Sequence, residues 1–170
     1  DYLIINSKMA DNDYEMDEEE LNGIMEYEYK HVKDSEDLKN YGFRVENEKE
    51  GDYKTWKILM TAPDDSDYKG GKYLIKVEFQ LDYPLVNPKF TFITPIYHCN
   101  VKQNGELNVN WLMKGMKIDY IMPRLLTLFY LQDPSVDENS EISKLYKDES
   151  KKDEFKRNIE KNAQEAKGEL

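Results

Sequence analysis

Two stretches of the chain alternate apolar and polar side chains, the pattern of strands that bury one face. In residues 53–61, Trp56, Ile58 and Met60 are spaced two positions apart. The segment between this stretch and the second one contains Pro63, Asp64, Asp65 and Ser66, which favour turns. In the second stretch a further apolar face is formed by Tyr73, Ile75, Val77 and Phe79. Short turns join strands that pair antiparallel, so these stretches predict the centre of an antiparallel meander.

Two weaker patterns extend this sheet to four strands. Residues 41–46 are predicted as the first strand, and Phe90 with Phe92 marks the fourth. Ahead of the sheet, apolar residues follow a helical period up to about Val32, namely Leu21, Ile24, Met25, Tyr29 and Val32. We therefore expect an N-terminal extension over residues 1–13, which should be flexible, and one domain over residues 14–168.

Helical patterns return after residue 119. Residues 120–131 predict an amphipathic helix with Pro123 in its first turn, and residues 141–146 predict a short one. Ser150 and Asp153 have the spacing of a capping box for a last helix. That helix has an apolar stripe formed by Phe155, Ile159, Ala163 and Ala166. A four-stranded antiparallel meander packed against an N-terminal helix and C-terminal helices is an α+β domain.

Composition excludes several classes of function. The formal net charge of −11 argues against nucleic-acid binding, which needs a basic surface. No apolar run reaches the roughly 18 residues of a membrane-spanning helix, so we expect no membrane insertion. A single cysteine and two histidines in separate elements predict neither a disulfide nor a metal site, and we expect no cofactor. The cysteine content suits a reducing compartment, the cytoplasm or the nucleus.

One segment carries a recognisable motif. Tyr97-His98-Cys99-Asn100-Val101 is followed by three residues and then by Gly105-Glu106-Leu107-Asn108-Val109. This run resembles the active-site signature of ubiquitin-conjugating enzymes, which is aromatic-His-Pro-Asn-aliphatic followed by Gly-x-aliphatic-Cys-aliphatic. Cys99 stands in the proline position, a substitution that the family tolerates. Asn108 stands where the family has its thioester-forming cysteine.

Two further motifs, in the expected order, strengthen the resemblance. The segment from Tyr68 to Gly71 is similar to the Tyr-x-Gly-Gly that precedes the family's third strand. The segment 82–88 is similar to its Asp-Tyr-Pro-x-x-Pro-Pro, with Asn87 in place of one proline. The resemblance implies the ubiquitin-conjugating (UBC) fold.

The residue at position 108 bears directly on catalysis. Thioester exchange needs a thiolate as nucleophile and leaving group, and a carboxamide does not ionise near neutral pH. No active catalytic residue is therefore predicted. In the family, the asparagine matching Asn100 stabilises an oxyanion or orders the loop, and the histidine matching His98 braces the turn. We expect both to be structural here, and we expect the single thiol, Cys99, to be a small buried residue. Replacing Asn108 by alanine is expected to leave fold and binding nearly unchanged. If Asn108 instead caps the loop through buried hydrogen bonds, its loss would cost about 1–3 kcal/mol.

The resemblance also implies partners. Leu85 and Asn87 match the loop that many members use to bind ligases, and Met116 with Lys117 falls in a second ligase-contacting loop, where the family's Trp-Ser-Pro-Ala is missing. The predicted first helix is acidic where the family tends to be basic. We therefore expect contact with ubiquitin or a ubiquitin-like modifier, and with an active conjugating enzyme or a ligase.

Three functions remain open at this point. The first is a catalytically inactive homologue that binds or scaffolds components of ubiquitin or ubiquitin-like conjugation. The second is an active conjugating enzyme, a ubiquitin transferase, that uses a non-standard residue such as Cys99. The third is an adaptor with the same fold and no contact with ubiquitin.

Overall fold

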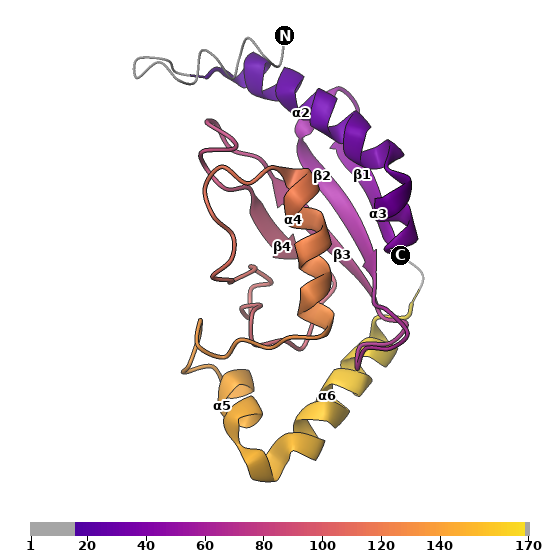
Figure 1. Ribbon diagram of the computed structural model, residues 1–170, viewed down its shortest axis with the longest axis vertical. Coiled ribbons are helices and arrows are strands. Elements are labelled where there is room, and N and C mark those ends of the chain that lie inside the picture. Colours follow the sequence, from indigo (N-terminus) through magenta and orange to yellow (C-terminus); the bar gives the residue numbers. More distant parts are fainter. Residues whose placement is uncertain (1–15, 169–170) are drawn as a thin grey trace.

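The computed structural model describes residues 16–168, which form a sheet flanked by helices (Figure 1). The expected N-terminal extension, residues 1–13, lies outside the described residues. In chain order the elements are α2 (Glu18–Asp34), α3 (Glu36–Asn40), β1 (Phe43–Lys49), β2 (Asp52–Thr61), β3 (Lys72–Glu78), β4 (Lys89–Phe92), α4 (Ile118–Leu125), the 3-10 helix η1 (Leu126–Phe129), α5 (Glu141–Lys147), the 3-10 helix η2 (Glu149–Lys151) and α6 (Lys152–Glu165).

The four strands form the predicted antiparallel meander, in the order β1-β2-β3-β4. Trp56, Ile58 and Met60 of β2 are fully buried, as the alternation predicted. β1 begins at Phe43, two residues later than expected. Gly42 has a φ of +84°, and a Cβ there would lie 3.2 Å from the Thr61 carbonyl oxygen. Residues 41 and 42 therefore form the turn into the strand.

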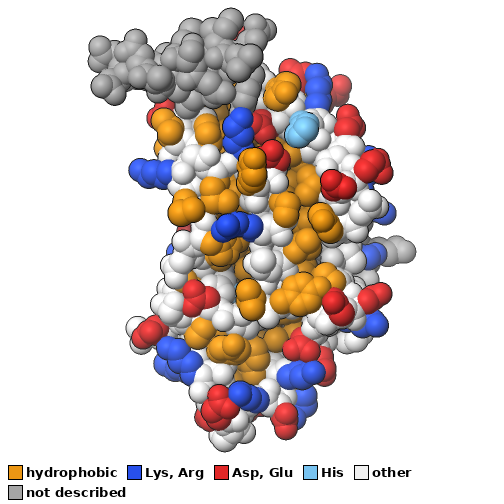
Figure 2. All heavy atoms as spheres, in the orientation of Figure 1, with side chains coloured by type: hydrophobic (Ala, Val, Ile, Leu, Met, Phe, Trp, Pro, Cys, Tyr) orange, Lys and Arg blue, Asp and Glu red, His pale blue; other side chains and the backbone are white. Residues whose placement is uncertain are grey.

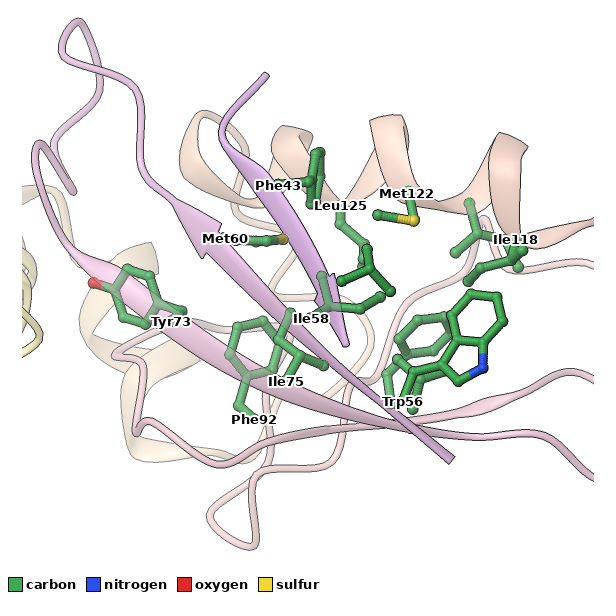
Figure 3. Close-up of a cluster of buried hydrophobic side chains, with 14 of the residues drawn as sticks. Phe43, Trp56, Ile58, Met60, Tyr73, Ile75, Phe92, Ile118, Met122 and Leu125 are labelled. Carbon is green, nitrogen blue, oxygen red and sulfur yellow. The ribbon is translucent and has the colours of Figure 1, made fainter. Parts of the chain in front are cut away.

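Helices cover one face of this sheet. α4 points Ile118, Met122 and Leu125 toward the apolar face of the strands (Figure 3). α2 lies on the same face, because the ring of its Tyr29 meets that of Trp56 edge-on at 5.5 Å. Each fully buried large apolar side chain contributes about 1.5–3 kcal/mol. This shared core fixes α2 and α4 on the sheet.

The helix after the sheet differs from its prediction. α4 begins at Ile118, two residues before Tyr120, so Pro123 lies in the second turn and not in the first. The N–H group of Ile118 donates to the Tyr83 hydroxyl oxygen at 2.7 Å, which provides a partner at the start of the helix. The helix changes to 3-10 geometry at Leu126. The single helix predicted over residues 120–131 is therefore, in the structure, a short α-helix followed by a 3-10 helix.

The predicted capping box of the last helix is wrong, although its apolar stripe is right. Ser150 lies in η2, where its N–H and its hydroxyl both bond to the Asp148 carboxylate. α6 begins two residues later, and Lys151 at its N-cap makes no side-chain capping bond. The stripe residues Phe155, Ile159, Ala163 and Ala166 are all buried. No helix within residues 16–168 is both long and apolar enough to cross a bilayer.

The start of α2 gives a test of the fold. The Asp17 carboxylate accepts hydrogen bonds from the N–H groups of Glu19 and Glu20, each at 2.9 Å. The Glu20 carboxylate accepts in return from the N–H group of Asp17. Asp17→Ala should lower the free energy of unfolding by about 1 kcal/mol, because it removes the cap. Urea unfolding is the measurement, and Asp34→Ala at the other end of α2 is the control, where an acid opposes the helix dipole. An equal loss in both variants would contradict the capping role.

Candidate functional site

The site is built on a buried histidine. His98 is fully buried. Its Nε2 lies 2.8 Å from the Leu128 carbonyl oxygen and 3.1 Å from that of Leu131. Its Nδ1 accepts the N–H group of Asn100 at 2.8 Å. Because carbonyl oxygens only accept, Nε2 carries the proton and Nδ1 is unprotonated. The imidazole therefore ties the 98–101 turn to the end of η1.

Burial keeps this imidazole neutral. It lowers the pKa of His98 from the ordinary 6.5 to about 4, although the carbonyl oxygens of Leu128 and Leu131 favour the cation. Both ring nitrogens are engaged by backbone groups. A general base needs a free nitrogen within reach of an acidic group. The expected bracing role is the one that this geometry allows.

Asn100 joins three backbone segments. Its N–H group bonds to His98, and its carbonyl oxygen accepts the N–H group of Asn108 at 2.8 Å. The side-chain Nδ2 donates to the carbonyl oxygens of Asn108 and Asp133, at 3.1 and 3.2 Å. The side-chain Oδ1 accepts the N–H group of Asp133 at 2.9 Å. A carboxamide has two N–H donors, and both are engaged. An oxyanion could gain a donor from this amide only after one of these bonds breaks.

Asn108 lies beside Asn100 at the position of interest. Its side chain is half-buried, and its Nδ2 donates to the Val136 carbonyl oxygen at 3.1 Å. Of the two expectations for Asn108, the bond to Val136 favours the one in which its side chain holds the loop by a hydrogen bond. The residue connects the 105–109 loop to the loop before α5. It has no ionisable group to act as a nucleophile.

The single thiol, on Cys99, is buried next to these two asparagines. Cys99 has 3% of its area exposed. Burial raises the pKa of its thiol, and the nearby Ser143 hydroxyl of α5 opposes this only in part. Its N–H group donates to the Gln132 side-chain oxygen at 2.9 Å. A buried thiol with a raised pKa is a poor nucleophile. The position of Cys99 therefore fits the small buried residue that the sequence predicted.

A groove lies next to this pair of asparagines. It encloses about 360 Å³ and is lined by Asn100, Trp111, Leu131, Asp133 and other residues. The Arg124 guanidinium lies 5.9 Å from the centre of the Trp111 ring. Among residues 16–168 there is no group of three or more His, Cys, Asp or Glu side chains that could hold a metal ion. Both polar and apolar side chains line the groove.

The structure brings the predicted partner-binding residues together in two adjoining loops. Asn87 Nδ2 donates to the Leu112 carbonyl oxygen at 3.1 Å. The N–H group of Gly115 donates to the Pro84 carbonyl oxygen at 2.8 Å. Leu85 is 52% exposed, whereas Met116 is partly buried against the core. The stretch assigned to the second loop, 116–119, is half helical, because α4 starts at Ile118.

Lys117 is the N-cap of α4 and makes no side-chain capping bond. The apolar residue that this loop exposes is Met113, 60% of which is accessible. The sequence analysis did not select Met113. The Lys114-Gly115 pair that follows it indicates a turn in the loop. Nothing in the sequence indicates that the Met113 side chain is exposed. The binding role of these loops stays a prediction.

Sequence reasoning also missed the residues that hold the site from the other side. Gln132 accepts from Cys99 and donates to the Tyr68 hydroxyl oxygen at 2.8 Å, and this hydroxyl donates to the Tyr97 carbonyl oxygen. Val136 provides the carbonyl that Asn108 bonds. These contacts join residues 28 to 64 positions apart. No local pattern marks them.

Comparison with known families supports the resemblance. The family described as "Ubiquitin-conjugating enzyme" matches residues 25–163. The chain belongs to this family. It is 32% identical to "Probable ubiquitin-conjugating enzyme E2 31" of Arabidopsis thaliana over 96 residues, 54% of this chain and 62% of that protein. It is 29% identical to "Probable ubiquitin-conjugating enzyme E2 L460" of Acanthamoeba polyphaga mimivirus over 127 residues, 72% of this chain and 80% of that protein. The match thus spans less than two thirds of the plant relative.

The first prediction from the site concerns acid stability. Between pH 6.5 and about 4 the unfolded chain protonates His98 and the native state does not, so stability falls as pH falls through this window. The loss from this group is about 3 kcal/mol at most. Unfolding free energies of the wild type and His98→Gln at pH 7, 6, 5 and 4 are the measurement. The variant should be less stable at pH 7 but should lose less on acidification. Parallel curves would contradict the buried neutral imidazole.

The second prediction concerns Asn108. Asn108→Ala removes the donor to the Val136 carbonyl and should lower the unfolding free energy by about 1 kcal/mol. Asn110→Ala is the matched control, because Asn110 is exposed and its side chain bonds only to the exposed Asp133 carboxylate at 3.3 Å. It should change stability by less than about 0.5 kcal/mol. Thermal unfolding of both variants measures the difference. Equal melting temperatures would show that the Asn108 bond does not stabilise the loop.

Proposed function

We propose that this protein is a catalytically inactive member of the ubiquitin-conjugating enzyme family that acts as a binding or scaffolding partner in ubiquitin or ubiquitin-like protein conjugation. The observation that carries the proposal is the carboxamide of Asn108, held by the Val136 carbonyl beside Asn100. An acyl thioester needs a sulfur atom at this point, and an amide nitrogen is neither a usable nucleophile nor a good leaving group.

The same geometry weakens the competing proposal of an active enzyme that uses Cys99. Its thiol is buried and its pKa is raised, whereas a transferring thiol must be exposed and partly ionised. His98, the neighbouring residue, cannot activate it, because both of its ring nitrogens are bonded to backbone groups. Transfer through Cys99 would require the 98–101 turn to open.

A surface suited to partners remains in place without the nucleophile. Apolar side chains run along the face that α4 occupies, with charged residues at its margins (Figure 2). The loops beside α4 expose Leu85, Val86 and Met113. Exposed apolar groups gathered on one face are typical of protein-binding surfaces. This surface supports the binding of a ligase, of an active conjugating enzyme or of the modifier itself.

The test of inactivity is a loading assay. Activating enzyme, ATP and ubiquitin are incubated with the protein and separated on a non-reducing gel, with an ordinary conjugating enzyme as positive control. We expect no band shifted by one ubiquitin. A shifted band sensitive to thiol reductant would overturn the proposal. Repeating the assay with Cys99→Ser then shows whether Cys99 carries the ubiquitin.

Asn108→Cys is a second arm of this assay. It returns a thiol to the site, but we expect loading and discharge more than about tenfold below the positive control, a barrier difference of roughly 1.4 kcal/mol. The first turn of α2 presents Glu18, Glu19 and Glu20. These acids would repel an acidic surface on the activating enzyme, and like charges across an interface slow association. Activity within tenfold of the control would show that position 108 alone silences the enzyme.

Binding separates the proposed partner from an adaptor that does not contact ubiquitin. The protein is titrated with free ubiquitin and with an active conjugating enzyme, and the chemical shifts or the heat of binding are followed. Saturable binding to either, weakened by Met113→Asp and Leu85→Asp and unchanged by Gln103→Asp in an exposed turn, supports the proposal. No binding to either would favour the adaptor.

A further inference from the structure

The sequence contains two asparagine–glycine pairs, Asn22-Gly23 and Asn104-Gly105. Asparagine is a thermolabile residue, since its side-chain amide can be lost. A following glycine favours this loss, because it has no side chain to hinder the approach of its own backbone nitrogen to the asparagine carboxamide. The two pairs lie in different settings, the first within α2 and the second in a turn.

Asn104 is exposed at a tight turn that spans residues 102–106. The N–H group of Gly105 donates to the Lys102 carbonyl oxygen at 2.9 Å, which closes a β-turn. The N–H group of Lys102 donates to the Glu106 carbonyl oxygen, also at 2.9 Å. The carboxamide of Asn104 therefore lies at the tip of a short hairpin, where a leaving group can pass directly into solvent.

The contacts of this carboxamide leave it open to attack. Asn104 Nδ2 lies 3.5 Å from the Glu106 carboxylate, at the limit of a hydrogen bond. Asn104 Oδ1 accepts the N–H group of Glu106 at 3.1 Å. A donor on Oδ1 stabilises the negative charge that this oxygen gains when the carbon beside it is attacked. The amide nitrogen is thus weakly held, and the carbonyl is polarised.

The fold requires the glycine of this pair. Gly105 has a φ of +83°, a conformation that residues with a side chain rarely adopt. A Cβ at this position would also collide with the Phe92 carbonyl oxygen of β4. The residue that makes Asn104 labile therefore cannot be exchanged without disturbing the turn.

We propose that Asn104 is a modification site, at which the chain itself converts asparagine to isoaspartate and aspartate with time. The backbone nitrogen of Gly105 attacks the carboxamide carbon, and the new C–N bond closes a cyclic succinimide. The bond from this carbon to Nδ2 breaks, and Nδ2 leaves as ammonia with the proton that Gly105 gives up. Water then opens the ring at either carbonyl, and is the only other reactant. This inference does not rest on the proposed function.

Asn22 has the same neighbour but a different environment. It is half-buried, and its Nδ2 donates to the Gly51 carbonyl oxygen at 3.1 Å. Its Oδ1 accepts the N–H group of Tyr53 at 2.7 Å. Both ends of this carboxamide are therefore fixed to the turn between β1 and β2, and the backbone of Gly23 is fixed in the helix. Ring closure at Asn22 requires α2 to open first.

The modification should loosen the turn. Isoaspartate continues the chain through its side-chain carbon, so the turn gains one backbone atom. The Gly105 carbonyl oxygen, which accepts the N–H group of Phe92 at 2.8 Å, would be displaced. The new carboxylate also lies near that of Glu106, which pairs with Lys102 at 3.3 Å. Like charges at this distance repel, so the contact between the turn and β4 weakens.

The experiment compares the native chain with the chain unfolded in guanidinium chloride, both incubated at neutral pH for the same time. Tryptic peptides are analysed by mass spectrometry, with fragment spectra that assign the conversion to Asn22 or Asn104. A sample digested at the start corrects for conversion during digestion. In the unfolded chain the two sites should react within about twofold of each other, because neither keeps its native contacts.

In the native chain Asn104 should react at least about tenfold faster than Asn22, because only Asn22 needs the helix to open. It should nevertheless react more slowly than in the unfolded chain, since the bond from Gly105 to Lys102 must break before the nitrogen can attack. The rate at Asn104 should rise with pH, because this nitrogen attacks after losing its proton.

The product is identified with a methyltransferase specific for isoaspartyl residues and radiolabelled S-adenosylmethionine, applied to the aged native chain. Asn104→Gln should remove most of the label, because the longer side chain keeps the carboxamide but closes a ring slowly. Asn110→Gln is the matched control, since Asn110 is also exposed but precedes the bulky Trp111. It should leave the label within about twofold.

Hydrogen exchange tests the loosened turn. The modified chain carries one more negative charge and is separated from the unmodified chain by anion exchange. The N–H groups of Phe92 and Lys102 should exchange faster in the modified form, because their acceptors lie in the turn. The N–H group of Tyr53, bonded to Asn22, is the control and should exchange at an unchanged rate. Unchanged exchange at Phe92 and Lys102 would contradict the loosening.

Faster conversion at Asn104 than at Asn22 in the native chain, with the label lost in Asn104→Gln, supports the proposal. Equal native rates at the two sites would overturn it, since both would then react only through global unfolding. An intact Asn104 after a time in which the unfolded chain converts would also overturn it, as would undiminished label in Asn104→Gln. Loading with ubiquitin is not a readout, so failure here would leave the proposed function standing.

Discussion

The site depends on an imidazole that is too deeply buried to carry charge. His98 receives one backbone N–H and donates toward two backbone carbonyls, and a protonated ring could not accept the first of these bonds. The neutral form is therefore required by the contacts as well as favoured by the burial. Removing it would leave the N–H group of Asn100 without its partner in the interior, which costs about 1–3 kcal/mol. The turn that holds Asn100 and Cys99 has its shape because this ring is present.

From this turn the same arrangement spreads outward through asparagine side chains. Asn100 joins the 98–101 turn to the 105–109 loop and to Asp133, and Asn108 joins that loop to Val136. Carboxamides suit this task because each has two donors and an acceptor in one plane. The loops around the site are irregular, so their backbone groups have no strand or helix to pair with. Polar side chains provide the partners, and few of their donors are left for a substrate.

The elements predicted from the sequence are those that local patterns determine. Trp56, Ile58 and Met60 marked β2 because a strand that buries one face repeats every two residues, and Phe155 with Ile159 marked α6 by the helical period. The predictions failed where a distant residue decides the outcome. α4 starts early because the hydroxyl of Tyr83, 35 positions away, accepts its first N–H group. Ser150 does not cap α6, because its hydroxyl donates to the Asp148 carboxylate instead. In the site, the motif placed Asn100 and Asn108 next to each other correctly. The bond to Val136 comes from a loop with no motif, so only the fold reveals it.

These contacts separate the stability of the site from its chemistry. The bond from Asn108 to Val136 is worth about 1 kcal/mol, against a typical total stability of about 5–15 kcal/mol. A thiol at position 108 would be a weak donor to that carbonyl, and the loop would tolerate the difference. The brace around His98 and Asn100 does not involve the side chain at position 108, so it would persist with either residue. Exchanging asparagine for cysteine at position 108 therefore changes the fold little. Of the two side chains, only the cysteine has a sulfur atom that could hold an acyl group as a thioester. For the same reason the loops that expose Leu85 and Met113 can keep their shape with either residue at position 108, since the contacts that join them, from Asn87 to Leu112 and from Gly115 to Pro84, do not involve that residue.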